Sequence, residues 1–141
     1  MSTKISRLAV LSIFIICISG CALSREKKAE EMYSLGAFLT KLCKSVEATV
    51  RYKNPPEAIT DDELLLLSTQ HDPSLLEPFE GYYKKVLRSD RHAAILVCTL
   101  DRRHGLLADI CCTSALDNNL WLTDSAPCEF TMDVQERCRV P

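Results

Sequence analysis

The sequence has few of the features that mark common catalytic and nucleic-acid-binding sites. Its 141 residues include only four glycines, and it has neither a G-x-S-x-G nor an H-E-x-x-H motif. A phosphate-binding glycine loop, a serine hydrolase and a zinc protease are therefore not indicated. The formal net charge is -2, whereas a nucleic-acid-binding protein needs concentrated positive charge. We expect no enzyme, no cofactor and no nucleic-acid partner.

The cysteine content points away from the cytosol. Charged residues make up 26% of the chain and hydrophobic residues 47%, which is typical of one ordinary folded domain. Eight of the residues are cysteines, although the reducing cytosol gives paired thiols little structural use. The composition therefore predicts a domain that folds in an oxidising compartment.

The N-terminus has the three-part layout of a secretion signal. Lys4 and Arg7 give a positive start, and Leu8–Ile18 is an apolar run that only Ser12 interrupts. The run ends at Ile18-Ser19-Gly20-Cys21, which resembles the lipobox of bacterial lipoproteins. This resemblance covers roughly the first sixth of the chain and concerns where the protein lies rather than what it does.

The lipobox resemblance implies a lipid anchor. Residues 1–20 would be a signal peptide, Cys21 would carry a diacylglyceryl group after cleavage, and residues 21–31 would be the lipidated cysteine and a short tether. Residue 22 is alanine. An aspartate at this position would resemble an inner-membrane retention signal, so its absence favours the outer membrane, with the protein facing the periplasm. Two alternatives are an ordinary cleaved signal and an uncleaved anchor. The uncharged stretch Leu8–Ser24 lies at the lower limit of roughly 17–25 residues for a spanning helix.

The clearest predicted element is an amphipathic helix at the start of a single α+β domain over residues 32–141. Apolar residues recur at steps of three and four, with Phe38 and Cys43 beside them, and a polar face opposes them. The stripe is Met32, Leu35, Leu39, Leu42, Val46 and Val50, and the polar face is Lys41, Lys44, Glu47 and Arg51. The sequence Asn54-Pro55-Pro56 should end the helix.

A small antiparallel sheet is expected to follow. Thr60 and Glu63 form a capping box for a short helix over 61–69. Strands are predicted at 82–88, 93–100 and 106–110, and form a three-stranded meander. The tail is predicted to hold a short helix around 114–120 and a strand-like segment over 130–134. The long helix would pack on this meander.

Six cysteines remain beyond Cys21, and an even set in an exported domain predicts three disulfides. Cys43 on the helix and Cys98 in the central strand could join helix to sheet. Cys111 and Cys112 would then take Cys128 and Cys138 in either order. A metal site is the alternative, but there is no C-x-x-C pair and no histidine in the cysteine-rich tail. We expect no metal.

Two features could contact a partner. Arg102, Arg103 and His104 form a basic turn, which is either an anion or acidic-partner contact or a solvated loop. A second basic group, Arg88, Arg91 and His92, should lie at the opposite end of the meander. Trp121 belongs either to the core or to an interface.

Together these features predict a membrane-tethered, non-enzymatic module that binds another envelope protein, as part of an envelope or secretion apparatus. The second hypothesis is an inhibitor or immunity protein that inserts the loop 101–105 or 117–124 into a toxin or hydrolase. A small envelope enzyme is a third hypothesis.

Overall fold

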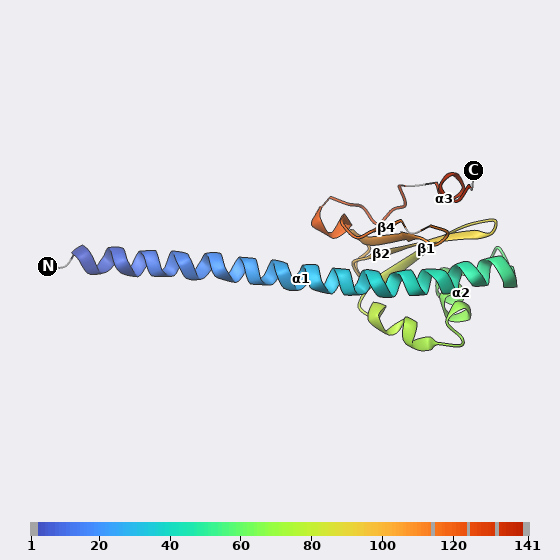
Figure 1. The fold of residues 1–141 in the computed structure, drawn as a ribbon, viewed down its shortest axis with the longest axis horizontal. Coiled ribbons are helices and arrows are strands. Elements are labelled where there is room, and N and C mark those ends of the chain that lie inside the picture. The colour runs from blue at the N-terminus through green and yellow to red at the C-terminus, as the bar shows by residue number, and fades with distance from the viewer. Residues whose placement is uncertain (1–2, 114, 124, 132, 140–141) are drawn as a thin grey trace. The chain divides into compact units, whose positions relative to one another are not determined.

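The computed structural model (Figure 1) describes residues 3–113, 115–123, 125–131 and 133–139, with side chains from Ser24 onward. The chain divides into two compact units, residues 1–31 and residues 32–141. Unit 1 is helical and contains the first part of α1 (Thr3–Lys53). In the part of the chain that the structure describes, no helix has the length and apolar character needed to cross a membrane. The predicted lipidation site, Cys21, lies outside the described side chains.

In unit 2, α1 buries the predicted apolar stripe. All six stripe residues are buried, and Cys43 is buried beside them. The helix ends at Lys53, directly before Asn54 and Pro55, as the prolines predicted. Asn54 has a φ of 45°, a left-handed conformation that turns the chain away from the helix axis. The helix prediction for this unit is confirmed.

The sheet is antiparallel, with the strand order β1-β2-β3-β4. Its strands are β1 (Tyr83–Ser89), β2 (His92–Cys98), β3 (Gly105–Ile110) and β4 (Leu116–Asp117). The three long strands confirm the predicted meander, and the two-residue β4 extends it at the β3 edge. The predicted α+β class, a long helix on an antiparallel sheet with disulfides, is correct.

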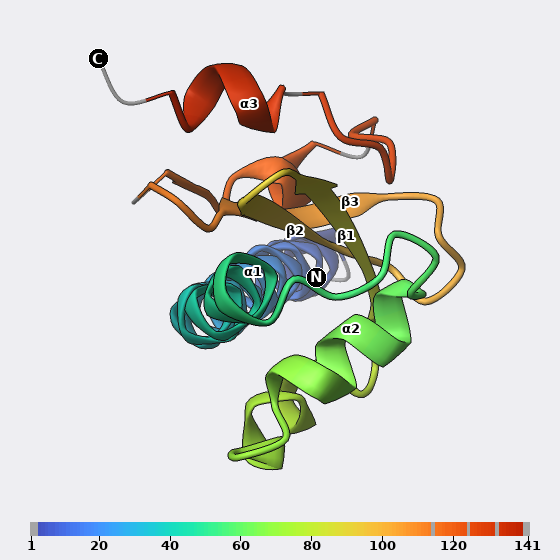
Figure 2. The ribbon, with the colours of Figure 1, turned by 90° about the vertical axis from the view of Figure 1, so that its right-hand side faces the viewer.

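Both faces of the sheet are covered (Figure 2). Ile95, Val97 and Leu107 pack with α1 in the main core. The alternate residues of the same strands, among them Leu96 and Ala108, pack against the C-terminal segment on the other face. Because each face has a cover, β2 is apolar along nearly its whole length instead of alternating.

The second helix, α2 (Asp61–Ser68), starts at the predicted capping box. The Glu63 amide donates to Thr60 Oγ1, and Glu63 Oε2 accepts from the Thr60 amide at 2.9 Å. Asp61 Oδ2 accepts a hydrogen bond from the Val86 amide of β1 at 3.1 Å. Because β1 is an edge strand, its free amides could form hydrogen bonds with a strand of another chain. The bond to Asp61 uses the Val86 amide and so makes such pairing less favourable. The short 3-10 helices η1 (Pro73–Leu75) and η2 (Glu77–Phe79) connect α2 to the sheet.

The tail differs from the prediction in two places. Within the described part of residues 114–120 the chain forms β4 rather than a helix, and the 3-10 helix η3 (Leu120–Leu122) follows. The segment predicted as a strand instead leads into α3 (Val134–Arg137), whose first amides are capped by the Asp133 carboxylate. Alternating residues suggested a strand, but Phe130 packs on the sheet face, and its described neighbours 131 and 133 belong to no strand.

Candidate functional site

Three disulfides join all six predicted cysteines. The pairs are Cys43–Cys111, Cys98–Cys128 and Cys112–Cys138, with Cα separations of 5.0, 5.7 and 5.8 Å. The number of bridges was predicted correctly, and of the pairings considered only Cys112–Cys138 is present.

The expected pairing of Cys43 with Cys98 is wrong, because these two side chains lie on opposite sides of β2. Ile95 and Val97 face α1, so strand alternation turns Cys98 toward the C-terminal segment. Cys111 instead packs on the α1 side of the sheet, where it reaches Cys43. Because residues 93–98 are all apolar, the sequence did not show which of them face α1, and so it could not exclude the wrong pair.

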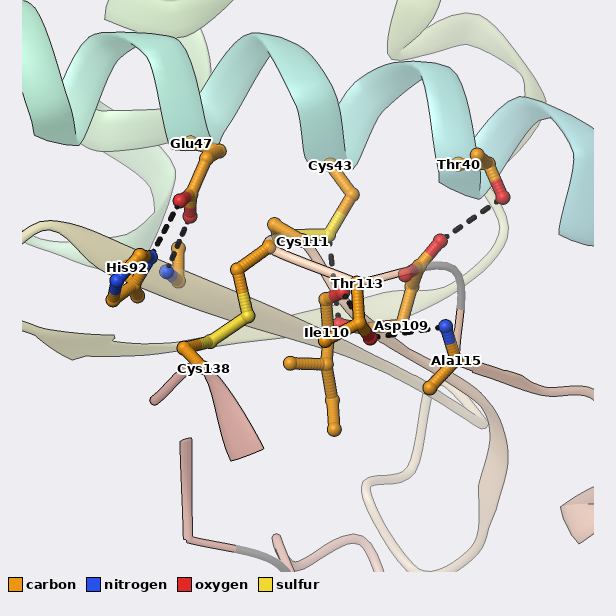
Figure 3. The surroundings of a disulfide bond; sticks show 12 residues. Thr40, Cys43, Glu47, His92, Asp109, Ile110, Cys111, Thr113, Ala115 and Cys138 are labelled. Atoms are coloured by element: carbon orange, nitrogen blue, oxygen red, sulfur yellow. Dashed lines mark hydrogen bonds and ion pairs between the residues drawn. A yellow bond between two sulfur atoms is a disulfide. The ribbon is translucent and has the colours of Figure 1, made fainter. Parts of the chain in front are cut away.

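Glu47, assigned from the sequence to the polar face of α1, is buried, with 8% of its surface exposed. Its Oε1 lies 2.7 Å from His92 Nδ1, and its Oε2 accepts the Ala93 amide at 2.8 Å (Figure 3). Arg51 Nη2 also donates to Oε1 at 2.9 Å. The carboxylate thus binds the first residues of β2 to the helix. The sequence offered one indication that Glu47 faces the sheet: it lies four residues after Cys43, one helical turn further along the same edge of the apolar stripe.

A second buried carboxylate was also missed. Asp109 in β3 is buried, and its Oδ2 accepts a hydrogen bond from Thr40 Oγ1 at 3.0 Å. Burial raises the pKa of the Asp109 carboxyl, while the Thr40 hydrogen bond and the charge of Lys44 act in the opposite direction. Thr40, Cys43 and Glu47 therefore form one line of contacts from α1 to the sheet (Figure 3).

His92 lies beside the third disulfide. A His92 ring nitrogen and the sulfur atoms of Cys112 and Cys138 all lie within 4.8 Å of one another. A pocket of about 290 Å³ opens at this point, lined by Ser89, Asp90, His92, Gln135, Cys138 and Arg139. We call Glu47, His92, Cys112 and Cys138 the hairpin-end cluster. It places an oriented imidazole beside a disulfide at a pocket that is open to solvent.

The predicted basic turn is a rigid loop over residues 99–104, which we call the basic loop. Asp101 Oδ1 accepts from the Thr99 hydroxyl at 2.5 Å and from the Arg103 amide at 3.1 Å. These bonds, first that of Thr99, lower the pKa of the Asp101 carboxyl. Arg102 has a φ of 61°, and its guanidinium lies 4.2 Å from the centre of the Tyr83 ring. Arg102 is thus held against the protein, while Arg103 extends outward with 79% of its side chain exposed.

The basic loop shares one end of the sheet with η3. A Cβ on Gly105, directly after the loop, would lie 2.9 Å from the Pro127 carbonyl oxygen and 3.8 Å from Leu120 of η3. Trp121 in η3 is partly buried and packs against the main core. Its neighbour Leu122 is 49% exposed, and Leu100 in the loop is 70% exposed. Three of the predicted contact residues thus lie on one loop, and Trp121 packs against the main core nearby.

The second basic group lies at the other end of the meander, as expected. Ser89 pairs with His92 at the hairpin turn, whereas Tyr83 pairs with Cys98 next to the basic loop. His92 is the first residue of β2, and its ring is hydrogen-bonded to Glu47.

The chain matches no protein-family model, and its comparison with curated proteins and with solved structures gives no significant match.

Proposed function

We propose that this protein is an exported, lipid-anchored lipoprotein of the cell envelope that binds another envelope protein without catalysing a reaction. The pairing of all six cysteines beyond Cys21 carries the proposal. Stable structural disulfides belong to oxidising compartments, and this agrees with the secretion signal and lipobox at residues 1–21. The proposal places the membrane contact at Cys21 and the protein contact on the folded domain, with the outer membrane as the membrane concerned.

The basic loop and η3 are the proposed contact surface. Leu100 and Leu122 expose apolar side chains there, and Arg103 adds an exposed guanidinium, whose Nε lies 3.6 Å from Asp101 Oδ2. Hydrogen bonds within the loop fix its backbone before binding, and this reduces the conformational entropy lost on association. The surface suits a partner with an apolar patch and a nearby acidic group.

The anchor is tested by a cysteine replacement. We expect the protein expressed in a bacterium to fractionate with membranes and to have the mass of residues 21–141 plus acyl groups. The Cys21→Ser variant should have the mass of the uncleaved precursor and carry no acyl groups. Cys17→Ser is the matched control and should behave like the wild type. An unmodified full-length mass for the wild type, with free thiols and recovery from the soluble cell interior, would contradict the proposal.

The contact surface is tested by photo-crosslinking in the native envelope. A photoreactive amino acid at Leu100 or Leu122 should give one discrete adduct with another protein. Leu66 on α2 is the matched control, because it is equally apolar and is 64% exposed but lies outside the surface. Equal adducts from all three positions, or none from Leu100 and Leu122, would reject this surface.

The rigid basic loop also fits the second hypothesis, an inhibitor or immunity lipoprotein. A loop held by Thr99 and Asp101 could enter a cleft of a toxin or hydrolase with little reorganisation. The two functions differ in the isolated complex. An inhibitor should form a tight one-to-one complex and abolish the partner's activity, whereas an accessory module should co-purify with a multiprotein assembly.

A further inference from the structure

The three disulfides lie in different surroundings. Each bridge joins one partly buried cysteine, Cys111, Cys128 or Cys112, to one buried cysteine. The buried members differ: Cys43 and Cys98 are 1% and 0% exposed, whereas Cys138 is 7% exposed and lines the pocket at the hairpin end. The Cys112–Cys138 bridge is therefore the one that a reductant can reach with the least disturbance of the core.

Opening this bridge leaves the sheet and its packing on α1 in place. Cys138 directly follows α3 near the end of the chain, so the bridge fastens only this last segment to the residue after Cys111. The Cys43–Cys111 and Cys98–Cys128 bridges still bind the helix and the tail to the sheet. A reduced form with free thiols at 112 and 138 should therefore remain folded.

The hydrogen bond to Glu47 prepares His92 for a metal ion. His92 Nδ1 is held at 2.7 Å by Glu47 Oε1, which leaves Nε2 as the nitrogen available for a ligand. Metal-binding histidines commonly place a carboxylate on the second ring nitrogen in this way, because it fixes the orientation of the ring and raises its basicity. Arg51 and the Ala93 amide fix the carboxylate in turn.

We propose that reduction of the Cys112–Cys138 bridge converts the hairpin-end cluster into a binding site for a thiophilic divalent cation such as Zn²⁺. The ligands are the two thiolates and His92, with Glu47 as a positioning residue. A protein or small-molecule dithiol supplies two electrons and two protons, and becomes a disulfide itself. The cation then displaces the two thiol protons, and two metal–sulfur bonds and one metal–nitrogen bond form.

The geometry allows this conversion without backbone movement. Zinc–sulfur bonds of about 2.3 Å at a tetrahedral angle place two sulfurs about 3.8 Å apart. Side-chain rotation can reach that spacing from a Cα separation of 5.8 Å, and the three ligand atoms already lie within 4.8 Å of one another. The pocket of about 290 Å³ leaves room for water or a substrate atom as the fourth ligand. Sequence spacing argued against a metal because no histidine lies in the tail, but the fold brings one there from β2.

The site is tested with the purified full chain under graded dithiothreitol, with alkylation and mass mapping to identify the opened bridge. We expect Cys112 and Cys138 to be alkylated first. Co²⁺ should then bind at one equivalent, with thiolate-to-cobalt absorption, and Zn²⁺ should displace it. The oxidised protein should bind neither cation in this way. Preferential opening of another bridge, or no cobalt–thiolate absorption after selective reduction, would overturn the proposal.

Variants separate ligation from folding. Cys112→Ser/Cys138→Ser should bind no Co²⁺, and His92→Ala should lose at least tenfold in affinity. Glu47→Gln should weaken Co²⁺ binding by about 10–100-fold, the usual effect of removing such an outer carboxylate. Its reduced thiols and far-ultraviolet circular dichroism should be unchanged.

His104→Ala is the matched control, since His104 lies at the other end of the sheet, and it should bind Co²⁺ like the wild type. If His92→Ala does not fold, the comparison of Glu47→Gln with His104→Ala decides the question. Wild-type affinity in a folded His92→Ala or Glu47→Gln variant would refute the assigned roles. The inference goes beyond the proposed function and does not depend on the lipid anchor.

Discussion

Replacing Glu47 by alanine should destabilise the domain far more than removing an ordinary helix glutamate. The Ala93 amide, in a fully buried residue, loses its acceptor, and an unsatisfied buried amide costs about 1–3 kcal/mol. The bond to the partly exposed His92 adds about 1 kcal/mol. The half-exposed pair with Arg51 adds at most about 1 kcal/mol. The expected loss is therefore about 2–5 kcal/mol, a large part of the 5–15 kcal/mol typical of a domain.

The measurement is urea unfolding at neutral pH with the disulfides intact, followed by circular dichroism. Glu30→Ala is the matched control, because Glu30 is an exposed glutamate of the same helix. It should change the free energy of unfolding by less than about 0.5 kcal/mol. A double-mutant cycle with His92→Ala should show a coupling between the two residues of at least about 0.5 kcal/mol. A Glu47→Ala loss no larger than that of Glu30→Ala would refute the structural role.

Three further perturbations test the fold. Replacing Cys43 and Cys111 by serine removes a bridge that closes a loop of 68 residues, and the chain-entropy model predicts a loss of about 4 kcal/mol in the free energy of unfolding. Urea unfolding measures this loss, and a value below about 1 kcal/mol would contradict the prediction. Asp109→Asn should stabilise the protein at neutral pH, because the raised pKa of Asp109 means that its charged form opposes folding. This gain should fade as the pH falls through the folded pKa, because below the ordinary pKa of 3.8 the carboxyl is neutral in both the folded and the unfolded state. A gain in stability that grows at low pH would contradict this reasoning. Gly105→Ala would place a Cβ 2.9 Å from the Pro127 carbonyl oxygen and should lower the unfolding free energy by about 1–3 kcal/mol, whereas Gly81→Ala, with no atom within 4 Å, should not.

Periodic patterns in the sequence predicted the elements that depend on local rules. The apolar residues from Met32 to Val50 recur at helical spacing, and one side of that helix is buried as expected. Thr60 and Glu63 located the start of α2, because a capping box needs only residues within one turn. The apolar run at 93–100 located the central strand for the same kind of local reason.

The candidate site was much less predictable. Glu47 was assigned to the solvated face, since charge alone does not show that a strand amide from Ala93 needs an acceptor. His92 was predicted only to lie with Arg88 and Arg91 at one end of the meander, because the sequence does not show that Glu47, 45 residues earlier, is its partner. In the tail, the short periodic pattern after Pro127 competed with the Cys98–Cys128 bridge, and tertiary packing prevailed over that pattern.

The sequence by itself determined the long helix, the meander, the number of disulfides and the expectation of an exported, anchored chain, because helix and strand periods and signal motifs act over neighbouring residues. Only the tertiary structure decided which cysteines pair and which charged side chains are buried. Those outcomes depend on which face of the sheet each residue occupies and on distances between segments far apart along the chain. The meeting of Glu47, His92 and the Cys112–Cys138 bridge at one end of the hairpin is of this kind.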